Sequence, residues 1–114
     1  MRTSQAEQPR SFASASVPKR LGNGEWELTA GPDWAQGRTL FGGLVGAAVA
    51  EAMTDLVPTD LSLRTLSISF AGPISPGSAQ INTHLDKTGT ATAFAGATVT
   101  QDGSIRTRAQ AVFA

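Results

Sequence analysis

The stretch GRTLFGGLVGAAVAEAMTDLVP, from Gly37 to Pro58, holds the one convincing helix in this sequence of 114 residues. Its small and apolar residues predict a helix from about Gly42 to Leu56. Pro58 ends it, because the residue before a proline disfavours helical backbone angles. Small residues recur at three- to four-residue spacing along one stripe of this helix: Gly43, Gly46 or Ala47, and Ala50. Such a stripe predicts that the helix packs closely against a sheet.

The residues around this helix alternate between apolar and polar with a period of two, which is typical of half-buried strands. We expect one strand before the helix and four after it: Glu25–Ala30, Leu66–Phe70, Ala79–Asp86, Thr90–Gln101 and Ile105–Phe113. Trp34–Phe41 is expected to be a loop, and Asp102-Gly103 is a hairpin turn signal. This order predicts an α+β fold in which an antiparallel sheet of about five strands, the last four in a meander, wraps round one central helix.

The chain length fits one domain. We expect residues 1–11 to form a flexible polar tail and residues 12–114 to form the single domain. A sheet of five strands cannot surround a helix completely, so the far side of the helix and at least one edge strand stay open. Pairing of two copies would cover both, and we therefore expect a homodimer or a higher homo-oligomer.

The composition argues against several classes of function. The formal net charge is zero, whereas nucleic-acid binding normally needs a clustered basic surface. The absence of cysteine excludes disulfides, thiolate zinc sites and a cysteine nucleophile, and it fits a reducing cytoplasm. The single histidine, His84, cannot form a histidine-based metal site alone, so we expect neither a metal nor another cofactor. No apolar run approaches the roughly 20 residues of a membrane span, and the N-terminus lacks the apolar segment of a secretory signal.

Four motifs follow one another along the chain. They are Phe41-Gly42-Gly43 at the helix start, Phe70-Ala71-Gly72-Pro73 at a strand end, Gly89 after a strand, and Gln101-Asp102-Gly103. Together, in this order and spacing, they resemble the acyl-CoA thioesterase family of the TesB type. The resemblance covers about Trp26 to Phe113. It implies a single hotdog fold, in which an antiparallel sheet cradles one long helix, and it implies hydrolysis of an acyl-CoA to the free acid and CoA.

The resemblance extends to the N-terminal repeat of that family, whose chains usually hold two hotdog repeats. The family's catalytic Asp, Thr and Gln generally come from the C-terminal repeat, and the position of that Gln corresponds here to Ala111. Gln110 is adjacent, but neighbours on a strand face opposite ways. Single-repeat hotdog thioesterases commonly have a His before the two glycines and an acid seven residues after them. Phe41 and Ala50 occupy these positions here, and Glu51 follows one residue later.

Thioester hydrolysis needs a stabilised carbonyl oxygen, an activated water and a grip on the CoA. Backbone N–H groups at a helix N-terminus supply the first, and Gly42 and Gly43 would let the thioester approach them. The alternative is that both glycines serve only close packing between helix and sheet.

The water needs a carboxylate base, for which Glu51 and Asp33 are the candidates near the helix. Glu51 alternatively lies with Asp55 on a solvated or dimer-facing stripe, and Asp33 alternatively serves a turn. His84 is interpreted as a solvated histidine on the polar face of a strand, with no acid partner at a telling spacing.

Trp34 and Phe41 are candidates for an acyl pocket, with core or interface packing as the alternative. Arg38 is the candidate for holding the CoA phosphates. Arg106 and Arg108 offer the same chemistry, but the simpler interpretation makes them exposed strand residues.

We therefore expect a cytoplasmic, homo-oligomeric acyl-CoA thioesterase that binds neither nucleic acid nor a membrane. The alternative is a catalytically degenerate hotdog protein that binds acyl-CoA or partners a catalytic subunit, because Ala50 and Ala111 occupy the two expected catalytic positions. A hotdog dehydratase or hydratase ranks below both, since those enzymes rely on a catalytic His with an acid.

Overall fold

The computed structural model describes residues 17–31, 35–36, 39–40 and 42–114. The elements within these residues are β1 (Lys19–Gly22), β2 (Glu25–Ala30), β3 (Ala35–Gln36), β4 (Thr39–Leu40), α3 (Gly42–Thr54), β5 (Leu63–Phe70), β6 (Gly77–Thr88), β7 (Ala93–Gln101) and β8 (Ser104–Phe113). Six of the strands form one antiparallel sheet in the order β1-β2-β6-β7-β8-β5, and β3 and β4 form a separate two-stranded pair.

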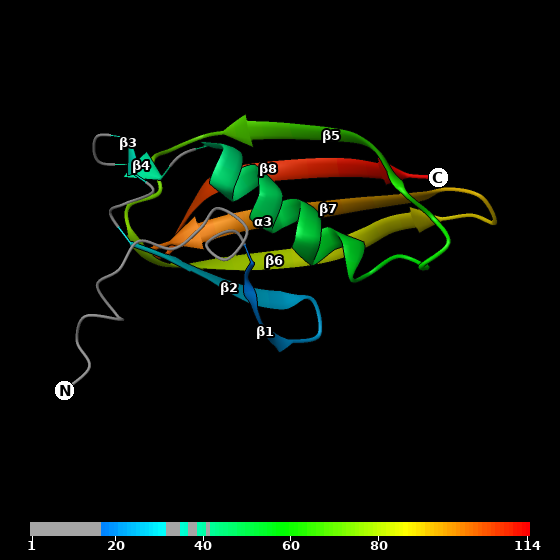
Figure 1. Cartoon of the computed structure of the whole chain (residues 1–114), viewed down its shortest axis with the longest axis horizontal. Coiled ribbons are helices and arrows are strands. Elements are labelled where there is room, and N and C mark those ends of the chain that lie inside the picture. The colour runs from blue at the N-terminus through cyan, green and yellow to red at the C-terminus, as the bar shows by residue number, and fades with distance from the viewer. Residues whose placement is uncertain (1–16, 32–34, 37–38, 41) are drawn as a thin grey trace.

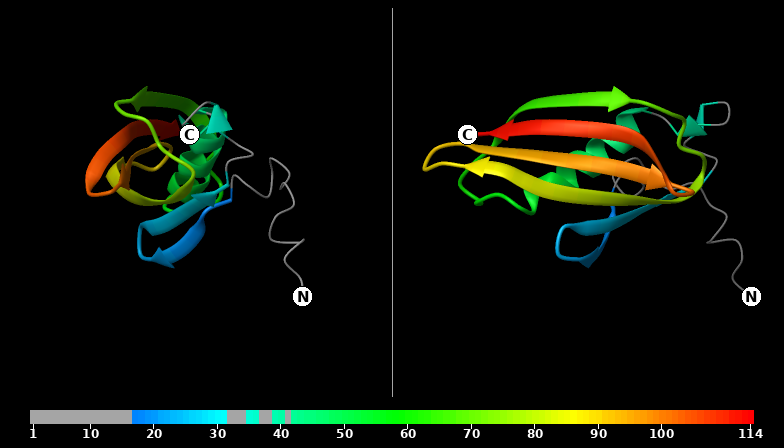
Figure 2. Two further views of the ribbon diagram at one scale, coloured as in Figure 1. Left: turned by 90° about the vertical axis from the view of Figure 1, so that its left-hand side faces the viewer. Right: turned by 180° about the vertical axis from the view of Figure 1, so that it is seen from behind.

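The helix α3 lies across one face of this sheet (Figure 1). Seen along its length, the sheet curves so that its two edge regions lie on either side of the helix (Figure 2). This arrangement confirms the expected α+β hotdog fold, with six strands in the main sheet in place of about five.

Three features of the strands differ from the expectation. The edge strand β1 was not expected, because its four residues KRLG are exposed or half-buried and show no alternation. The last four strands do not form a simple meander, because β5 pairs with β8 and not with β6. The segment expected to be a loop contains the short strands β3 and β4. The pairing of β5 with β8 depends on hydrogen bonds between strands that are far apart in the sequence, and a local residue pattern does not show which strands pair.

The alternation expected in β7 and β8 is confirmed. Ala93, Ala95, Ala97 and Val99 of β7 and Thr107, Ala109, Ala111 and Phe113 of β8 are buried on the inner face. The turn between these strands has positive φ values at Asp102 (53°) and Gly103 (78°). Positive values at both central residues are the signature of a type I′ turn, whose twist matches that of the strands.

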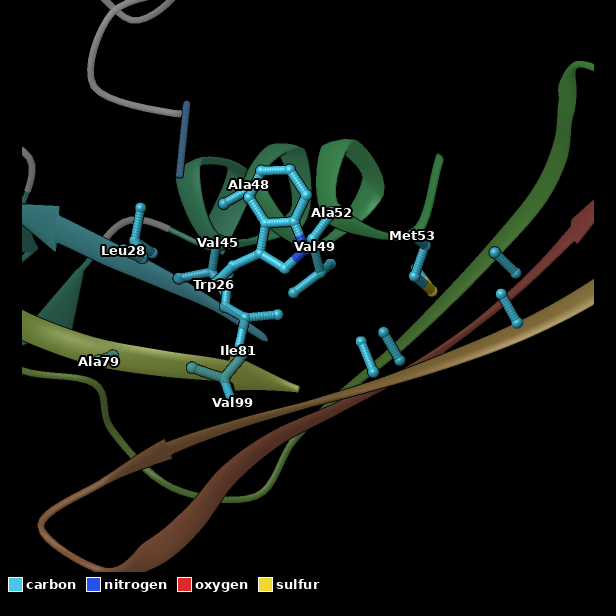
Figure 3. Close-up of a cluster of buried hydrophobic side chains, with 14 of the residues drawn as sticks. Trp26, Leu28, Val45, Ala48, Val49, Ala52, Met53, Ala79, Ile81 and Val99 are labelled. Atoms are coloured by element: carbon cyan, nitrogen blue, oxygen red, sulfur yellow. The ribbon is translucent and has the colours of Figure 1, made fainter. Parts of the chain in front are cut away.

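The core fills the layer between the helix and the inner face of the sheet (Figure 3). The helix contributes Leu44, Val45, Ala48, Val49, Ala52 and Met53, and β2 and β6 contribute Trp26, Leu28, Ala79 and Ile81. The stripe of small residues does not face the sheet as a unit. Gly43 is exposed and Ala50 is half-buried, whereas Gly46 is buried, and a Cβ added to it would lie 3.1 Å from Ile68 Cδ1 of the sheet. Burial of the larger apolar residues sets the rotation of the helix.

The helix ends at Thr54, two residues before the expected end and four before Pro58. Backbone bonds from Leu56 N to Met53 O (3.0 Å) and from Val57 N to Thr54 O (3.2 Å) continue the chain as a turn. Among the described residues, no helix is long and apolar enough to cross a membrane.

Candidate active site

The first turn of α3 begins with Gly42 and Gly43 and contains no acidic side chain. Backbone N–H groups in a first helical turn have no acceptor within the helix, and they carry the positive end of the helix dipole. Gly43 is exposed and Gly42 is half-buried. Gly42 and Gly43 carry no side chains of their own, so within the described part of the chain this first turn can offer its N–H groups to a partially negative oxygen.

Phe70, the last residue of β5, lies against this helix end. A Cβ added at Gly42 would lie 3.3 Å from the Phe70 ring, so the glycine makes room for the ring. The ring nevertheless remains 56% exposed. The Phe70 ring therefore provides an apolar surface beside the backbone N–H groups of the first helical turn, which are polar donors. Phe70 belongs to one of the four sequence motifs but was not among the predicted site residues, although its position at the end of an alternating strand pointed to it.

Thr107 on β8 is the buried polar residue nearest this region in the strand register. It pairs with Phe70 of β5 on one side and with Val99 of β7 on the other. The residue is 0% exposed, and its Oγ1 has no hydrogen-bond partner within the described part of the chain. A lone threonine among inward-facing alanines was the sequence signal for it.

Glu51 lies on the exposed side of α3, nine residues after Gly42. At 1.5 Å per residue, it is about 13 Å along the helix axis from the glycines, too far to act there within one protomer. Asp55, which was expected to share its face, pairs with Arg20 of β1 at 3.4 Å. Of the two candidate bases, the structure therefore describes one, and it does not bring that one to the helix N-terminus.

The other sequence-predicted site residues lie outside the described residues. These are the candidate base Asp33, the candidate acyl-pocket residues Trp34 and Phe41, and the candidate CoA-binding residue Arg38. The expected tail, residues 1–11, also lies outside them.

His84 corrects one expectation, because it does have an acid partner. Its Nε2 lies 3.0 Å from Oδ1 of Asp86, and both side chains are about half exposed on the outer face of β6. The imidazole lies over Gly96 of β7, where an added Cβ would meet the ring. Residues two apart on a strand share a face, so the spacing alone permitted this pair. Among the described residues, no group of three or more His, Asp or Glu could hold a metal ion.

Gln101, from the last of the four motifs, has a structural role. Its side chain is buried and accepts a hydrogen bond from Ser75 N (2.9 Å) while donating to Ser75 O (3.0 Å) and Ser78 O (3.2 Å). These bonds fix the connection between β5 and β6. Gln110, as expected, is exposed on the opposite face, and Ala111 is buried on the inner face. Arg106 donates to Pro73 O at 2.9 Å, and Arg108 is exposed.

Solved structures with the same fold cover almost the whole chain. A candidate thioesterase II of Thermobifida fusca YX has a TM-score of 0.86 at 23% identity, covering 93% of this chain and 40% of that one. The TesB protein of Mycobacterium avium subs. paratuberculosis has a TM-score of 0.81 at 16% identity, covering 90% and 41%. A Bacillus halodurans protein solved with CoA has a TM-score of 0.76 at 18% identity, covering 97% and 79%. The chain thus spans about two fifths of the length of the first two proteins.

No curated protein matches the sequence significantly. The sequence model of one family, described as the acyl-CoA thioesterase N-terminal domain, matches residues 30–114, which is well over half of the chain. This range includes the whole helix and every strand from β3 onward. The chain therefore belongs to the acyl-CoA thioesterase N-terminal domain family.

Proposed function

We propose that this protein hydrolyses an acyl-CoA to the free acid and CoA, with the thioester carbonyl bound at the N-terminus of α3. The observation that carries the proposal is the first turn of α3, where Gly43 is exposed, Gly42 lies against the exposed ring of Phe70, and no acidic residue is present. The family membership supports thioester chemistry at such a site.

In this proposal the carbonyl oxygen accepts hydrogen bonds from the backbone N–H groups of the first helical turn. These donors stabilise the negative charge that grows on the oxygen as water attacks the carbonyl carbon. The C–S bond then breaks, the sulfur leaves as the CoA thiol after gaining a proton, and the acyl group leaves as the acid. The Phe70 ring forms one wall for the acyl chain, Trp34 and Phe41 add to that pocket, and Arg38 holds the CoA phosphates.

The general base in this proposal is Glu51 of a second copy of the chain, with Asp33 as the weaker candidate. The carboxylate of Glu51 is exposed and forms no ion pair or hydrogen bond within the described part of the chain, so it is available to a partner. Two helices packed side by side in opposite directions would bring Glu51 of each copy toward the glycines of the other. A homodimer then stands in for the second repeat, and the lack of cysteine fits an enzyme of the cytoplasm.

Release of the CoA thiol from short-chain, long-chain and aromatic acyl-CoAs by the pure protein tests the proposal. We expect turnover with at least one class of substrate. Glu51→Gln should lower kcat by about 100-fold or more, because general-base catalysis contributes on this scale. Asp60→Asn, at an equally exposed acid in the turn after the helix, is the matched control and should leave kcat unchanged. Absence of turnover with all three classes would refute the proposal.

A second function is favoured by Ala50 and Ala111, which stand where related enzymes have catalytic residues. Ala111 is only 2% exposed and contributes no polar atom from its side chain. A protein that binds acyl-CoA without hydrolysing it would unfold at a higher temperature in the presence of acyl-CoA or CoA, since a ligand stabilises the state that binds it. Thermal stabilisation without thiol release would support this function, and detectable turnover would exclude it.

A further inference from the structure

The outer face of the sheet, which points away from α3, carries opposite charges on two of its strands. Glu25 and Glu27 of β2 point outward, between the buried inner residues Trp26 and Leu28. On β8, Arg106 and Arg108 occupy the same face, because they alternate with the buried residues Thr107 and Ala109. The strands between them, β6 and β7, present mostly uncharged polar side chains over the same rows.

The strand register aligns these charges. Glu25 pairs with Asn82 of β6, Asn82 with Thr98 of β7, and Thr98 with Arg108 of β8, so one row runs from an acid to a base. In the next row, Glu27 pairs with Gln80 and Gln80 with Thr100, whose neighbour on β8 is Ile105, next to Arg106 in the bulge. The charges therefore share rows across the sheet.

The acids and bases of one chain cannot reach each other. Strands β2 and β8 are separated by three strand spacings of about 4.8 Å, which is about 14 Å in all. The ion pairs among the described residues are Arg20–Asp55 and His84–Asp86, and none involves the charges of these two rows. Glu27 accepts a hydrogen bond from Ser78, and Lys19 of β1 lies opposite it in the register without forming an ion pair. Glu25 and Arg108 are therefore the clearest unpaired charges of opposite sign.

We propose that two copies of this chain pack outer face against outer face, about a twofold axis that runs parallel to the strands between β6 and β7. Rotation about this axis places β2 of one copy opposite β8 of the other, because the two strands lie at equal distances on either side of the axis. The rotation does not change the position of a residue along the strand direction, so each row faces the same row of the second copy. Glu25 of one copy then faces Arg108 of the other, and Glu27 faces Arg106. By symmetry each contact forms twice, as in any isologous interface. The uncharged pairs Asn82–Thr98 and Gln80–Thr100 lie between them.

The shape of the face suits such a contact. Aligned packing of two sheets keeps their strand directions within about 30° of each other, which is the arrangement that this axis produces. Two grooves mark the face and can receive side chains of the second copy. One, of about 340 Å³, is lined by residues that include Ser69, His84 and Arg108. The other, of about 350 Å³, is lined by residues that include Glu27, Gln80 and Thr100.

Charge reversal tests this interface through the molar mass of the 114-residue chain in sedimentation equilibrium. We expect the wild type to be heavier than the 11.8 kDa of one chain at low salt. Glu25→Arg and Arg108→Glu should each halve the measured mass, by raising the dissociation constant at least about tenfold. The double variant Glu25→Arg/Arg108→Glu should recover the wild-type mass, because it restores two opposite pairs. Asp60→Arg, an equal reversal away from the sheet, should not change the mass.

Two further measurements keep the test decisive. About 1 M salt, where the Debye length is about 3 Å, should lower the wild-type mass as the single reversals do. If a reversed variant loses its far-UV circular dichroism, Glu25→Gln and Arg108→Gln take its place, and either should still lower the mass. A monomeric wild type at low salt would overturn the proposal, as would single variants of unchanged mass or a double variant that fails to recover.

This inference rests on the sheet and its charges, and it does not depend on thioester hydrolysis. If the pairing through the helices that the proposed function requires also forms, the wild type is an assembly of four chains, and a single charge-reversal variant is an assembly of two. If that pairing fails, the same reversal changes two copies to one. Turnover and mass therefore report on the two proposals separately.

Discussion

The two faces of the six-stranded sheet differ in the burial and the polarity of their side chains. On the inner face, β7 and β8 present alanines, a valine, a threonine and Phe113, all nearly inaccessible to solvent beneath the helix. On the outer face the same two strands present Phe94, Thr98, Arg108 and Gln110, which are exposed or half-buried. The inner face is therefore limited by volume, whereas the outer face can vary in size and charge without disturbing the core.

This difference separates what holds the fold together from what a partner can recognise. Glycines of α3 allow its N-terminal half to lie close to β5, where Gly42 meets Phe70 and Gly46 lies against Ile68. The proposed chemistry lies at that rim, where the helix end opens to solvent. The proposed sheet-to-sheet contact uses the face that the helix leaves free. Matched residue pairs, one from each face, test whether the division holds.

The largest contrast is expected between two phenylalanines on neighbouring strands. Phe113 is 0% exposed on the inner face and Phe94 is 42% exposed on the outer face. Phe113→Ala should lower the free energy of unfolding by about 4 kcal/mol, since it removes a fully buried ring and leaves a cavity. Phe94→Ala should lower it by less than about 0.5 kcal/mol. Urea unfolding at about 1 M salt, which weakens any contact between copies, measures both. Equal losses for the two variants would contradict the division.

Much of the fold could be predicted from the sequence. Strands β7 and β8 are buried on one face only, so apolar and polar residues alternate along them with a period of two. The edge strand β1 could not be predicted in this way. Its residues are bound to β2 by backbone hydrogen bonds and bury little of their side chains. The pairing of β5 with β8 was also beyond local patterns, since any antiparallel neighbour satisfies the same alternation.

The site was less predictable than the fold. The resemblance placed Gly42 and Gly43 at the helix start, and the helix does begin at Gly42. The partnership of His84 with Asp86 was missed, although strand geometry puts residues two apart side by side. The contact between Phe70 and Gly42 depends on how closely the helix packs against β5, and the spacing of residues in the sequence does not determine that distance. The proposed base comes from a second copy of the chain. The small size of the sheet predicts such a copy, but the pattern of one chain does not show which of its residues reach the site.

A smaller contrast is expected between two glutamines. Gln101 is buried on the inner side and forms three hydrogen bonds to the backbone of Ser75 and Ser78, whereas Gln110 is exposed on the outer face. Gln101→Ala should cost about 2 kcal/mol of unfolding free energy, because it leaves backbone groups without partners. It should also speed amide hydrogen exchange at Ser75. Gln110→Ala should change stability by less than about 0.5 kcal/mol. If Gln101→Ala is as stable as Gln110→Ala, water replaces the lost bonds and the connection before β6 does not depend on the side chain.

The smallest contrast, and the one that bears on function, is expected between two threonines. Thr107 is fully buried with an unpartnered hydroxyl in the described part of the chain, whereas Thr98 is half-buried on the outer face. Thr107→Val should leave stability unchanged or raise it by up to about 1 kcal/mol, because it removes a polar group that is buried without a hydrogen bond. Thr98→Val should stay within about 0.5 kcal/mol of the wild type.

The same two variants separate packing from chemistry near the helix end. Thr107 pairs in register with Phe70, so its hydroxyl lies one strand away from the residue that borders the proposed thioester seat. A buried hydroxyl is retained at a cost unless something binds it. If a bound acyl-CoA supplies its missing partner, Thr107→Val should weaken acyl-CoA binding or turnover by about tenfold while the free protein is no less stable. Thr98→Val should change neither. A loss of stability above about 1 kcal/mol in Thr107→Val would instead mean that the hydroxyl already has a partner within the protein.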